Sequence, residues 1–256
     1  HPERTINPVW SPDSKWLAYS KRLVTQYHVI MAYSVDQAKS LQLTDGLSDA
    51  VSPAWDASGK YMYFLASTNY ALLSGWLDMS SLEHPLKRSA YLIVLKKGEP
   101  SPFLPESDEE KVERMAEEAK KEEADKKAKT KTTLPPPPKN LVTIDIDGIG
   151  QRILTIDVPA REYNRVAAGE EGTIFISEIV QNHDEPTLHK YVLKERKLSE
   201  FLSGASTFNL AQNGTKIIYR SSGQWYVAKT SEKPVGAEPL KIASVNVKLD
   251  PRQEWK

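Results

Sequence analysis

A short pattern that recurs along the chain constrains the fold more than any other feature. Residues 8–19 and 53–64 both begin with Pro-x-Trp, pass through a polar turn and end in an apolar, aromatic run. A third copy lies at residues 211–219, and a more degenerate fourth copy at residues 169–177. Pro, Asp, Ser and Gly supply the preset or positive φ angles that tight turns need. Each copy therefore predicts a turn followed by a β-strand.

The spacing of the copies indicates a repeat architecture. If Ser14, Gly59, Gly172 and Gly214 are equivalent, successive copies are 45, 113 and 42 residues apart. Two of these spacings match the roughly 40 to 50 residues of a four-stranded propeller blade, and the long one must contain insertions. We predict an all-β fold, a β-propeller of four-stranded antiparallel blades with about four repeats visible. Either the ring has four blades or, as we favour, it is incomplete and the chain is part of a larger ring.

The expected strands follow from the apolar runs that flank the turns. A hairpin is expected around Asp147-Gly148, because Asp-Gly between two alternating apolar runs is a strong hairpin signal. Residues 45–52 are expected to cross to the second blade and to supply an outer strand, and residues 69–88 to form a long loop. The predicted strands are 16–20, 28–34, 40–44, 60–66, 90–95, 141–146, 151–156, 173–180, 188–193, 201–202, 216–220, 224–228 and 243–248.

The composition changes abruptly in the middle of the chain. Residues 109–131 are nearly all Glu, Lys and Ala, and the run Pro135–Pro138 stops any helix. We expect a solvated helix or tether inserted at the surface, with a partner-docking arm as the alternative. The predicted organisation is propeller blades in 1–105, the charged insertion in 106–140, further blades in 141–249, and the start of a linker to a downstream domain in 250–256. We therefore expect a piece of a longer polypeptide.

Overall charge and cysteine content exclude several classes of function. The 34 basic and 34 acidic residues cancel, so no global field draws the chain to nucleic acid or an anionic membrane. The sequence contains no cysteine and therefore no disulfide or thiolate metal site. No apolar run approaches the roughly 18 residues that span a bilayer. We expect a cytoplasmic protein, with the periplasm as the alternative.

The chain carries no local motif of catalysis or cofactor binding. It lacks G-x-S-x-G, G-x-G-x-x-G, the P-loop pattern and H-E-x-x-H. Among His1, His28, His84, His183 and His189, only the last two are close in sequence, and their six-residue gap fits no standard zinc pair. We expect both to be ordinary surface histidines. We predict no catalytic, cofactor-binding or metal residues, and the substrate-binding residues stay unassigned.

Residues that recur with the repeat are interpreted as structural. Asp13 and Asp56 are taken to share one repeat position, occupied by Asn213 in the third copy, and to bond the turn backbone rather than to form paired catalytic carboxylates. Trp10, Trp55 and Trp225 are predicted to anchor blade packing rather than to stack on bases, because a basic stripe is missing. The glycosylation pattern Asn213-Gly214-Thr215 lies on a repeat turn and is interpreted as accidental.

Several segments together resemble a known family. They are residues 100–109, residues 144–149 with Arg152, Val158-Pro159-Ala160 before Tyr163-Asn164, Tyr219-Arg220 with residues 223–226, and residues 250–255. In this order the chain resembles the later part of the second, nominally seven-bladed propeller of tricorn-type serine proteases and their bacterial homologues, which implies that it is part of a seven-bladed ring. The similarity covers most of the chain outside residues 106–140, and the charged insertion departs from it.

The resemblance implies a peptidase as the parent molecule. Such proteins cleave oligopeptides with a serine and a histidine that lie in domains after the propellers, together with a PDZ domain. No counterpart of that serine or histidine lies in residues 1–256, so the segment is expected to be non-catalytic and to gate or scaffold the access of oligopeptide substrates. Expected partners are these peptides and the downstream PDZ and peptidase domains, and homo-oligomerisation of the parent is a further implication. The alternatives are a TolB-like interaction module and the propeller of a prolyl-oligopeptidase-type hydrolase.

Overall fold

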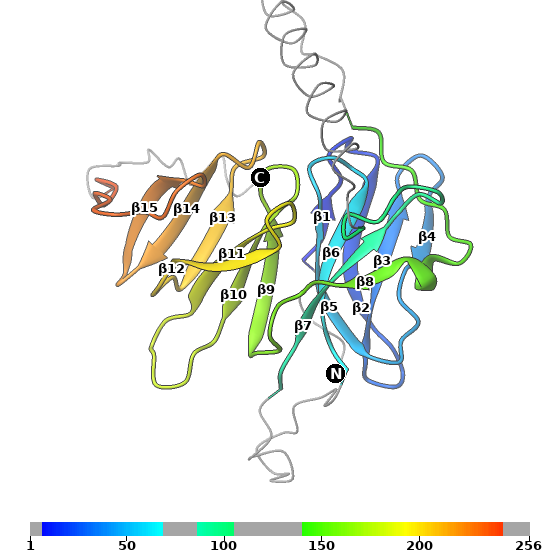
Figure 1. Ribbon diagram of the computed structural model, residues 1–256, viewed down its shortest axis with the longest axis horizontal. Helices are drawn as coiled ribbons and strands as arrows, with labels where there is room; N and C mark the ends of the chain where they lie inside the picture. Colours follow the sequence, from blue (N-terminus) through cyan, green and yellow to red (C-terminus); the bar gives the residue numbers. More distant parts are fainter. Residues whose placement is uncertain (1–6, 69–85, 105–139, 243–256) are drawn as a thin grey trace, which may run out of the picture.

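The computed structural model describes residues 7–68, 86–104 and 140–242, whose strands form four antiparallel sheets in chain order (Figure 1). We call these sheets blades one to four. Blade one contains β1 (Val9–Trp10), β2 (Trp16–Arg22), β3 (His28–Ser34) and β4 (Lys39–Gln42). Blade two contains β5 (Asp49–Trp55), β6 (Tyr61–Ser67), β7 (Ser89–Val94) and β8 (Ile153–Thr155). Blade three contains β9 (Tyr163–Ala168), β10 (Thr173–Glu178), β11 (Thr187–Val192) and β12 (Lys197–Leu202). Blade four contains β13 (Thr207–Leu210), β14 (Lys216–Ser221) and β15 (Gln224–Lys229).

The core consists of layers between blades rather than one central cluster. Alternate residues of a strand point to opposite faces of its sheet. In β6, Met62 and Phe64 therefore pack toward blade one, whereas Tyr63 and Leu65 pack toward blade three. Strand β10 divides in the same way, with Phe175 packing toward blade four. A strand buried on both faces is thus the mark of a blade that has a neighbour on each side.

The repeated pattern occupies the hairpin between the first two strands of each blade. Ser14, Gly59, Gly172 and Gly214 all have positive φ, between 60° and 74°, which confirms their equivalence. The turn of blade three is one residue shorter, because Gly169 N donates to Thr173 O where Asp56 N donates to Tyr61 O. The all-β expectation is confirmed, and so are antiparallel four-stranded blades in blades one to three; the described residues of blade four form three strands.

The expectation for residues 45–52 is wrong. Residues 49–55 form β5, the first strand of blade two, and they do not supply an outer strand. Each blade begins one strand before the repeated turn, so that β1, β5, β9 and β13 precede the strands predicted as first. The break in β5 obscured this strand: its register with β6 shifts between Val51 and Ala54, where Ser52 has a φ of 56° and Pro53 has no N–H to donate.

The hairpin expected around Asp147-Gly148 does not form. Residues 140–146 are not a strand, and a short 3-10 helix, η2 (Ile149–Arg152), leads into β8. Other groups take the hydrogen bonds that a hairpin needs. Asp145 N donates to Leu95 O at 3.0 Å, and the Arg152 guanidinium donates to the carbonyls of Val94, Asp145 and Asp147.

Several predictions lie outside the described residues. These are the loop over residues 69–85, the insertion over 106–139, the strand at 243–248 and the linker at 250–256. The proposed domain boundaries therefore stay predictions.

Candidate functional site: a cleft lined by the four first strands

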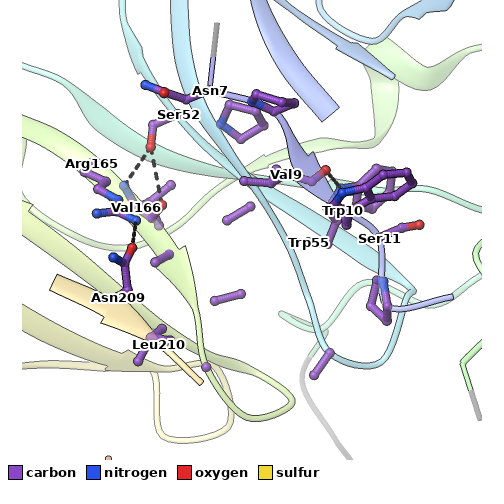
Figure 2. Close-up of a pocket in the computed structure, with 18 of the residues that line it drawn as sticks. Asn7, Val9, Trp10, Ser11, Ser52, Trp55, Arg165, Val166, Asn209 and Leu210 are labelled. Carbon is purple, nitrogen blue, oxygen red and sulfur yellow. Dashed lines mark hydrogen bonds between the residues drawn. The ribbon is translucent and has the colours of Figure 1, made fainter. Parts of the chain in front are cut away.

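The first strands of all four blades face a common cleft of about 1570 Å³ (Figure 2). Residues of β1, β5, β9 and β13, together with parts of the repeat turns that follow them, form most of its wall, and Ser20 of β2 and His28 of β3 also line it. Four sequence segments that are far apart in the chain therefore share one site. The sequence predicted the repeats that create this arrangement but assigned no residue to it.

The described lining is almost free of charge. It contains no Asp, Glu or Lys, although the chain has 34 acidic residues, and its only ionisable side chains are His28 and Arg165. The remaining polar side chains are neutral amides and hydroxyls: Asn7, Ser11, Ser14, Ser20, Ser52, Asn164, Asn209 and Gln212. Such groups donate and accept hydrogen bonds without selecting a side-chain charge.

His28 is held in the wall by a carboxylate of the next blade. Its Nδ1 lies 2.6 Å from Asp49 Oδ1, and its backbone N–H donates to the same oxygen at 3.0 Å. Arg88 lies 3.5 Å from the other oxygen of Asp49. Burial raises the pKa of Asp49, but the His28 hydrogen bonds and the charges of His28 and Arg88 outweigh it, so that the pKa lies below its usual value.

Ser52 joins the walls of blades two and three. Its hydroxyl accepts a hydrogen bond from Val166 N at 2.9 Å and donates to Val166 O at 3.3 Å (Figure 2). The left-handed backbone at Ser52 directs this side chain away from the ladder of its own blade. The sequence signal for it is the Ser-Pro pair that interrupts an apolar strand.

Arg165 joins the walls of blades three and four. Its Nη1 donates to Phe208 O at 2.6 Å, and its Nη2 donates to Asn209 Oδ1 at 2.9 Å (Figure 2). The guanidinium carbon also lies 4.6 Å from the centre of the Phe208 ring. Burial lowers the pKa of Arg165. No sequence signal distinguished this residue from other exposed positions of an alternating strand.

The predicted tryptophan anchors behave differently from one another. Trp55 is 6% exposed and its Nε1 donates to Val9 O of blade one at 3.0 Å, so it packs between two blades as predicted. Trp10 occupies the equivalent position in blade one, yet it is 59% exposed in the cleft. Trp225 lies half-buried on β15.

Aspartates of two repeat turns join other segments through hydrogen bonds, which we call latches. The geometry of these turns also shows that the predicted equivalence of Asp13 and Asp56 is wrong. With Ser14 equivalent to Gly59, Asp13 corresponds to Ser58, and Asp56 corresponds to Ser11. The two turns carry the same Ser–Asp hydrogen bond in opposite order. Asp13 and Asp56 therefore do not share a position, although Asn213 does correspond to Asp13 and accepts hydrogen bonds from Thr215 as a turn residue.

The second oxygen of each aspartate reaches across a blade boundary. Asp13 Oδ2 accepts from Val142 N at 2.9 Å, on the segment that leads into blade two. Asp56 Oδ2 accepts from Gly172 N of blade three at 2.8 Å and from the Tyr63 hydroxyl at 2.7 Å. The carboxylates hold blades together, which agrees with a structural role and not with a pair of catalytic acids.

Neither of the other two described histidines lines the cleft. His183 is exposed in a turn, as expected, but His189 is 8% exposed, and its Nε2 lies 2.6 Å from Glu178 Oε2. The surface prediction for His189 is therefore wrong, because the β10–β11 register places Glu178 within its reach. His1 and His84 lie outside the described ranges. Within those ranges no three His, Asp or Glu side chains cluster as metal ligands.

Antiparallel sheets that pack face to face and point their first strands at one cleft define the chain as part of a β-propeller. A family model for the second beta propeller domain of tricorn proteases matches residues 2–231. The chain belongs to this family.

Two curated relatives agree with this assignment. Tricorn protease homolog 1 of Streptomyces coelicolor is 25% identical over 97% of this chain and 24% of its own length. A tricorn-like protease C-terminal subunit of Sulfurisphaera tokodaii is 22% identical over 96% of this chain and 27% of its own length. The chain thus spans about a quarter of each relative.

Solved structures show the same fold. The crystal structure of the tricorn protease matches 96% of this chain and 23% of its own, with a TM-score of 0.65 and 18% identity. TolB from Acinetobacter baumannii matches 91% of this chain and 43% of its own, with a TM-score of 0.52 and 13% identity. Across the described ranges, no helix is both long and apolar enough to cross a membrane.

Proposed function

We propose that this chain is a non-catalytic propeller segment of a tricorn-like serine peptidase and that it admits extended oligopeptides through its cleft. One observation carries the proposal: the described wall is built mainly by the first strands of four blades and offers neutral hydrogen-bonding groups with only two ionisable side chains. Such a wall can contact the main chain of many peptides without selecting their side chains. Membership of a tricorn protease propeller family supports the peptidase context.

Restricted entry by size is a further part of this proposal. An extended peptide is narrow enough for a cleft between blades, whereas a folded domain is not, so the segment would filter substrates for an active site elsewhere in the polypeptide. The downstream PDZ and peptidase domains would then be its partners, and a cytoplasmic location would suit the breakdown of oligopeptides. A propeller that serves only as a TolB-like interaction module is the competing function.

Residues 1–256 contain no cysteine, so one substituted thiol is unique within this chain, and the unsubstituted polypeptide treated with the same label is the blank for thiols elsewhere. In the full polypeptide that carries this chain, Ala211→Cys places a thiol at an exposed position of the cleft wall. Gln37→Cys is the matched control, exposed in a turn of blade one and outside the wall. Both variants are labelled with maleimides of increasing size, and the cleavage of peptides of different length is measured.

We expect bulky labels at position 211 to slow the cleavage of peptides, and of longer peptides most, while the same labels at position 37 leave the rates unchanged. Equal rates for both labelled variants at every peptide length would refute passage through the cleft. Loss of a partner protein in pull-down experiments, with unchanged cleavage, would instead favour the interaction module.

A further inference from the structure

Arg165 is the one positive charge in the described cleft wall that meets no described carboxylate. The other ionisable group of the wall, His28, is paired with Asp49. Elsewhere in the described residues, Arg88 lies beside Asp49 and Arg161 beside Glu178. Arg165 meets only a carbonyl, an amide oxygen and an aromatic ring. Its charge is therefore half-buried without a counter-ion from the described residues.

The contacts of Arg165 orient its guanidinium and leave some of its N–H donors unused. The two hydrogen bonds and the Phe208 ring fix the guanidinium plane between β9 and β13. A guanidinium carries five N–H donors, and these two contacts use two of them. The unused donors belong to a residue of the cleft wall, and the described wall contains no acidic group that would compete for them.

We propose that Arg165 binds a carboxylate of the peptide that occupies the cleft. The carboxylate is either the α-carboxylate of the peptide or an acidic side chain, because both present the two oxygens that match a guanidinium fork. The proposal rests on the proposed function, since it needs a peptide in the cleft. It adds a preference for anionic groups to a wall that is otherwise neutral.

A purely structural role for Arg165 makes a different prediction. If the side chain only connects blades three and four, its replacement lowers stability and weakens the binding of every peptide by the same factor. A carboxylate-binding residue changes the ratio between anionic and neutral peptides. This ratio is therefore the quantity to measure.

The experiment uses the full polypeptide that carries this chain and three protease-resistant peptides of equal length. One has a free C-terminus, the second has the same sequence with a C-terminal amide, and the third is an amide with one internal Glu. We expect the free acid, the Glu peptide or both to bind about three- to tenfold more tightly than the neutral amide, as measured by calorimetry. The anionic peptide that binds more tightly than the neutral amide identifies the source of the carboxylate.

Variants then assign the preference to one residue. Arg165→Gln should bring the ratio to about one, and Arg165→Lys should keep part of it, because a single point charge remains without the fork. Arg220→Gln, on an exposed position of β14 outside the cleft wall, should leave the ratio intact. Circular dichroism confirms that each variant is folded.

The outcomes separate the two proposals. If none of the three peptides binds, the peptide cleft itself is refuted. If all three bind equally, or if the preference survives in Arg165→Gln, peptides bind in the cleft and the assignment to Arg165 is refuted.

Discussion

At the scale of single residues, the Tyr163 hydroxyl is buried without a partner. Tyr163 is 0% exposed at the interface of blades two and three, and its hydroxyl has no hydrogen bond to any described group. Burial raises the pKa of Tyr163 to about 12; Arg161 lowers it and Glu178 raises it by smaller amounts. The ring therefore contributes packing, and the hydroxyl costs free energy.

We expect Tyr163→Phe to raise the free energy of unfolding at pH 7 by about 1 kcal/mol, because the substitution removes an unpaired polar group and keeps the ring. In the unfolded chain tyrosine loses its proton near pH 10, whereas folded Tyr163 keeps it to about 12. The stability of the wild type should therefore fall as the pH rises from 10 through 12, and the variant should lose less. Urea unfolding at pH 7 and in this alkaline range measures both effects. A clear loss of stability at pH 7 would show that the hydroxyl has a partner.

Asp56 is the opposite case, a buried carboxylate with every oxygen occupied. It is 0% exposed and accepts hydrogen bonds from Ser58, Tyr63 and Gly172. Asp56→Asn places an NH₂ group where a donor already points, so we expect a loss of about 2 to 4 kcal/mol in urea unfolding. Asp36→Asn, at an exposed turn position, should change the free energy by less than about 0.5 kcal/mol. Similar losses in the two variants would contradict the latch.

Sequence reasoning at this scale found the turns but not their partners. The positive φ at Gly59 could be predicted, because the local residue types demand it. The pairing of His189 with Glu178, and of Arg165 with Asn209, could not, because each depends on how strands register or on how blades face one another. Ser and Asp also occur in opposite order in the turns of blades one and two. An alignment that pairs identical residues therefore places Asp13 opposite Asp56 incorrectly.

At the scale of elements, close backbone contact fixes blade four against blade three. A Cβ atom at Gly214 would lie 2.3 Å from Gly169 C and 2.3 Å from Glu170 N, both main-chain atoms that cannot rotate away. The hairpin of blade four therefore packs on the hairpin of blade three through a residue with no side chain.

Gly214→Ala should lower the free energy of unfolding by at least about 2 kcal/mol and should loosen blade four first, because the added methyl group forces the two hairpins apart. Gly223→Ala is the matched control: it has φ of +79°, similar to the +71° of Gly214, but no atom within 4 Å of the added Cβ. It should cost only the strain of the left-handed backbone, about 1 kcal/mol. Hydrogen exchange of β13 to β15 amides, measured by mass spectrometry, distinguishes the two. Equal protection of these amides in both variants would show that the contact between the two hairpins does not limit the stability of blade four.

The hairpin predicted around Asp147-Gly148 does not form. It shows why secondary-structure elements were harder to predict from the sequence than the conformation of single turn residues. Gly148 does adopt positive φ, as an Asp-Gly turn requires. The Arg152 guanidinium nevertheless donates to the carbonyls of Asp145 and Asp147, and Val142 of the first flank donates to Asp13 instead of pairing with β8. Local turn chemistry was predicted correctly, and tertiary contacts decided the outcome.

At the scale of the whole molecule, a line of hydrogen bonds and one Arg–Asp ion pair connects three blades. His28 of blade one meets Asp49 of blade two, and Arg88 of blade two meets both Asp49 and the Tyr163 carbonyl of blade three. The repeat period predicted that neighbouring blades pack, but not that charged groups would join them. Opposite charges in these partly buried positions should couple the stability of the assembly to pH.

Asp49 sets the sign of that coupling. Its pKa lies below the ordinary value of 3.8, so its contribution to stability is present above that value and is lost as the pH falls through the folded-state pKa. We expect the midpoint of thermal unfolding to drop steeply below about pH 4 in the wild type. Asp49→Asn should be less stable at pH 7 and should show a shallower acid limb. An acid limb of unchanged slope would assign the acid sensitivity to other carboxylates.

The latches that join blades one, two and three end on amide N–H groups of Val142 and Gly172. Every residue except proline offers such a group. At these two positions, the hydrogen bond to the aspartate therefore excludes proline and no other residue type. Side chains at these two positions can therefore change without loss of the contact, within the limits set by the burial of Val142 and the positive φ of Gly172.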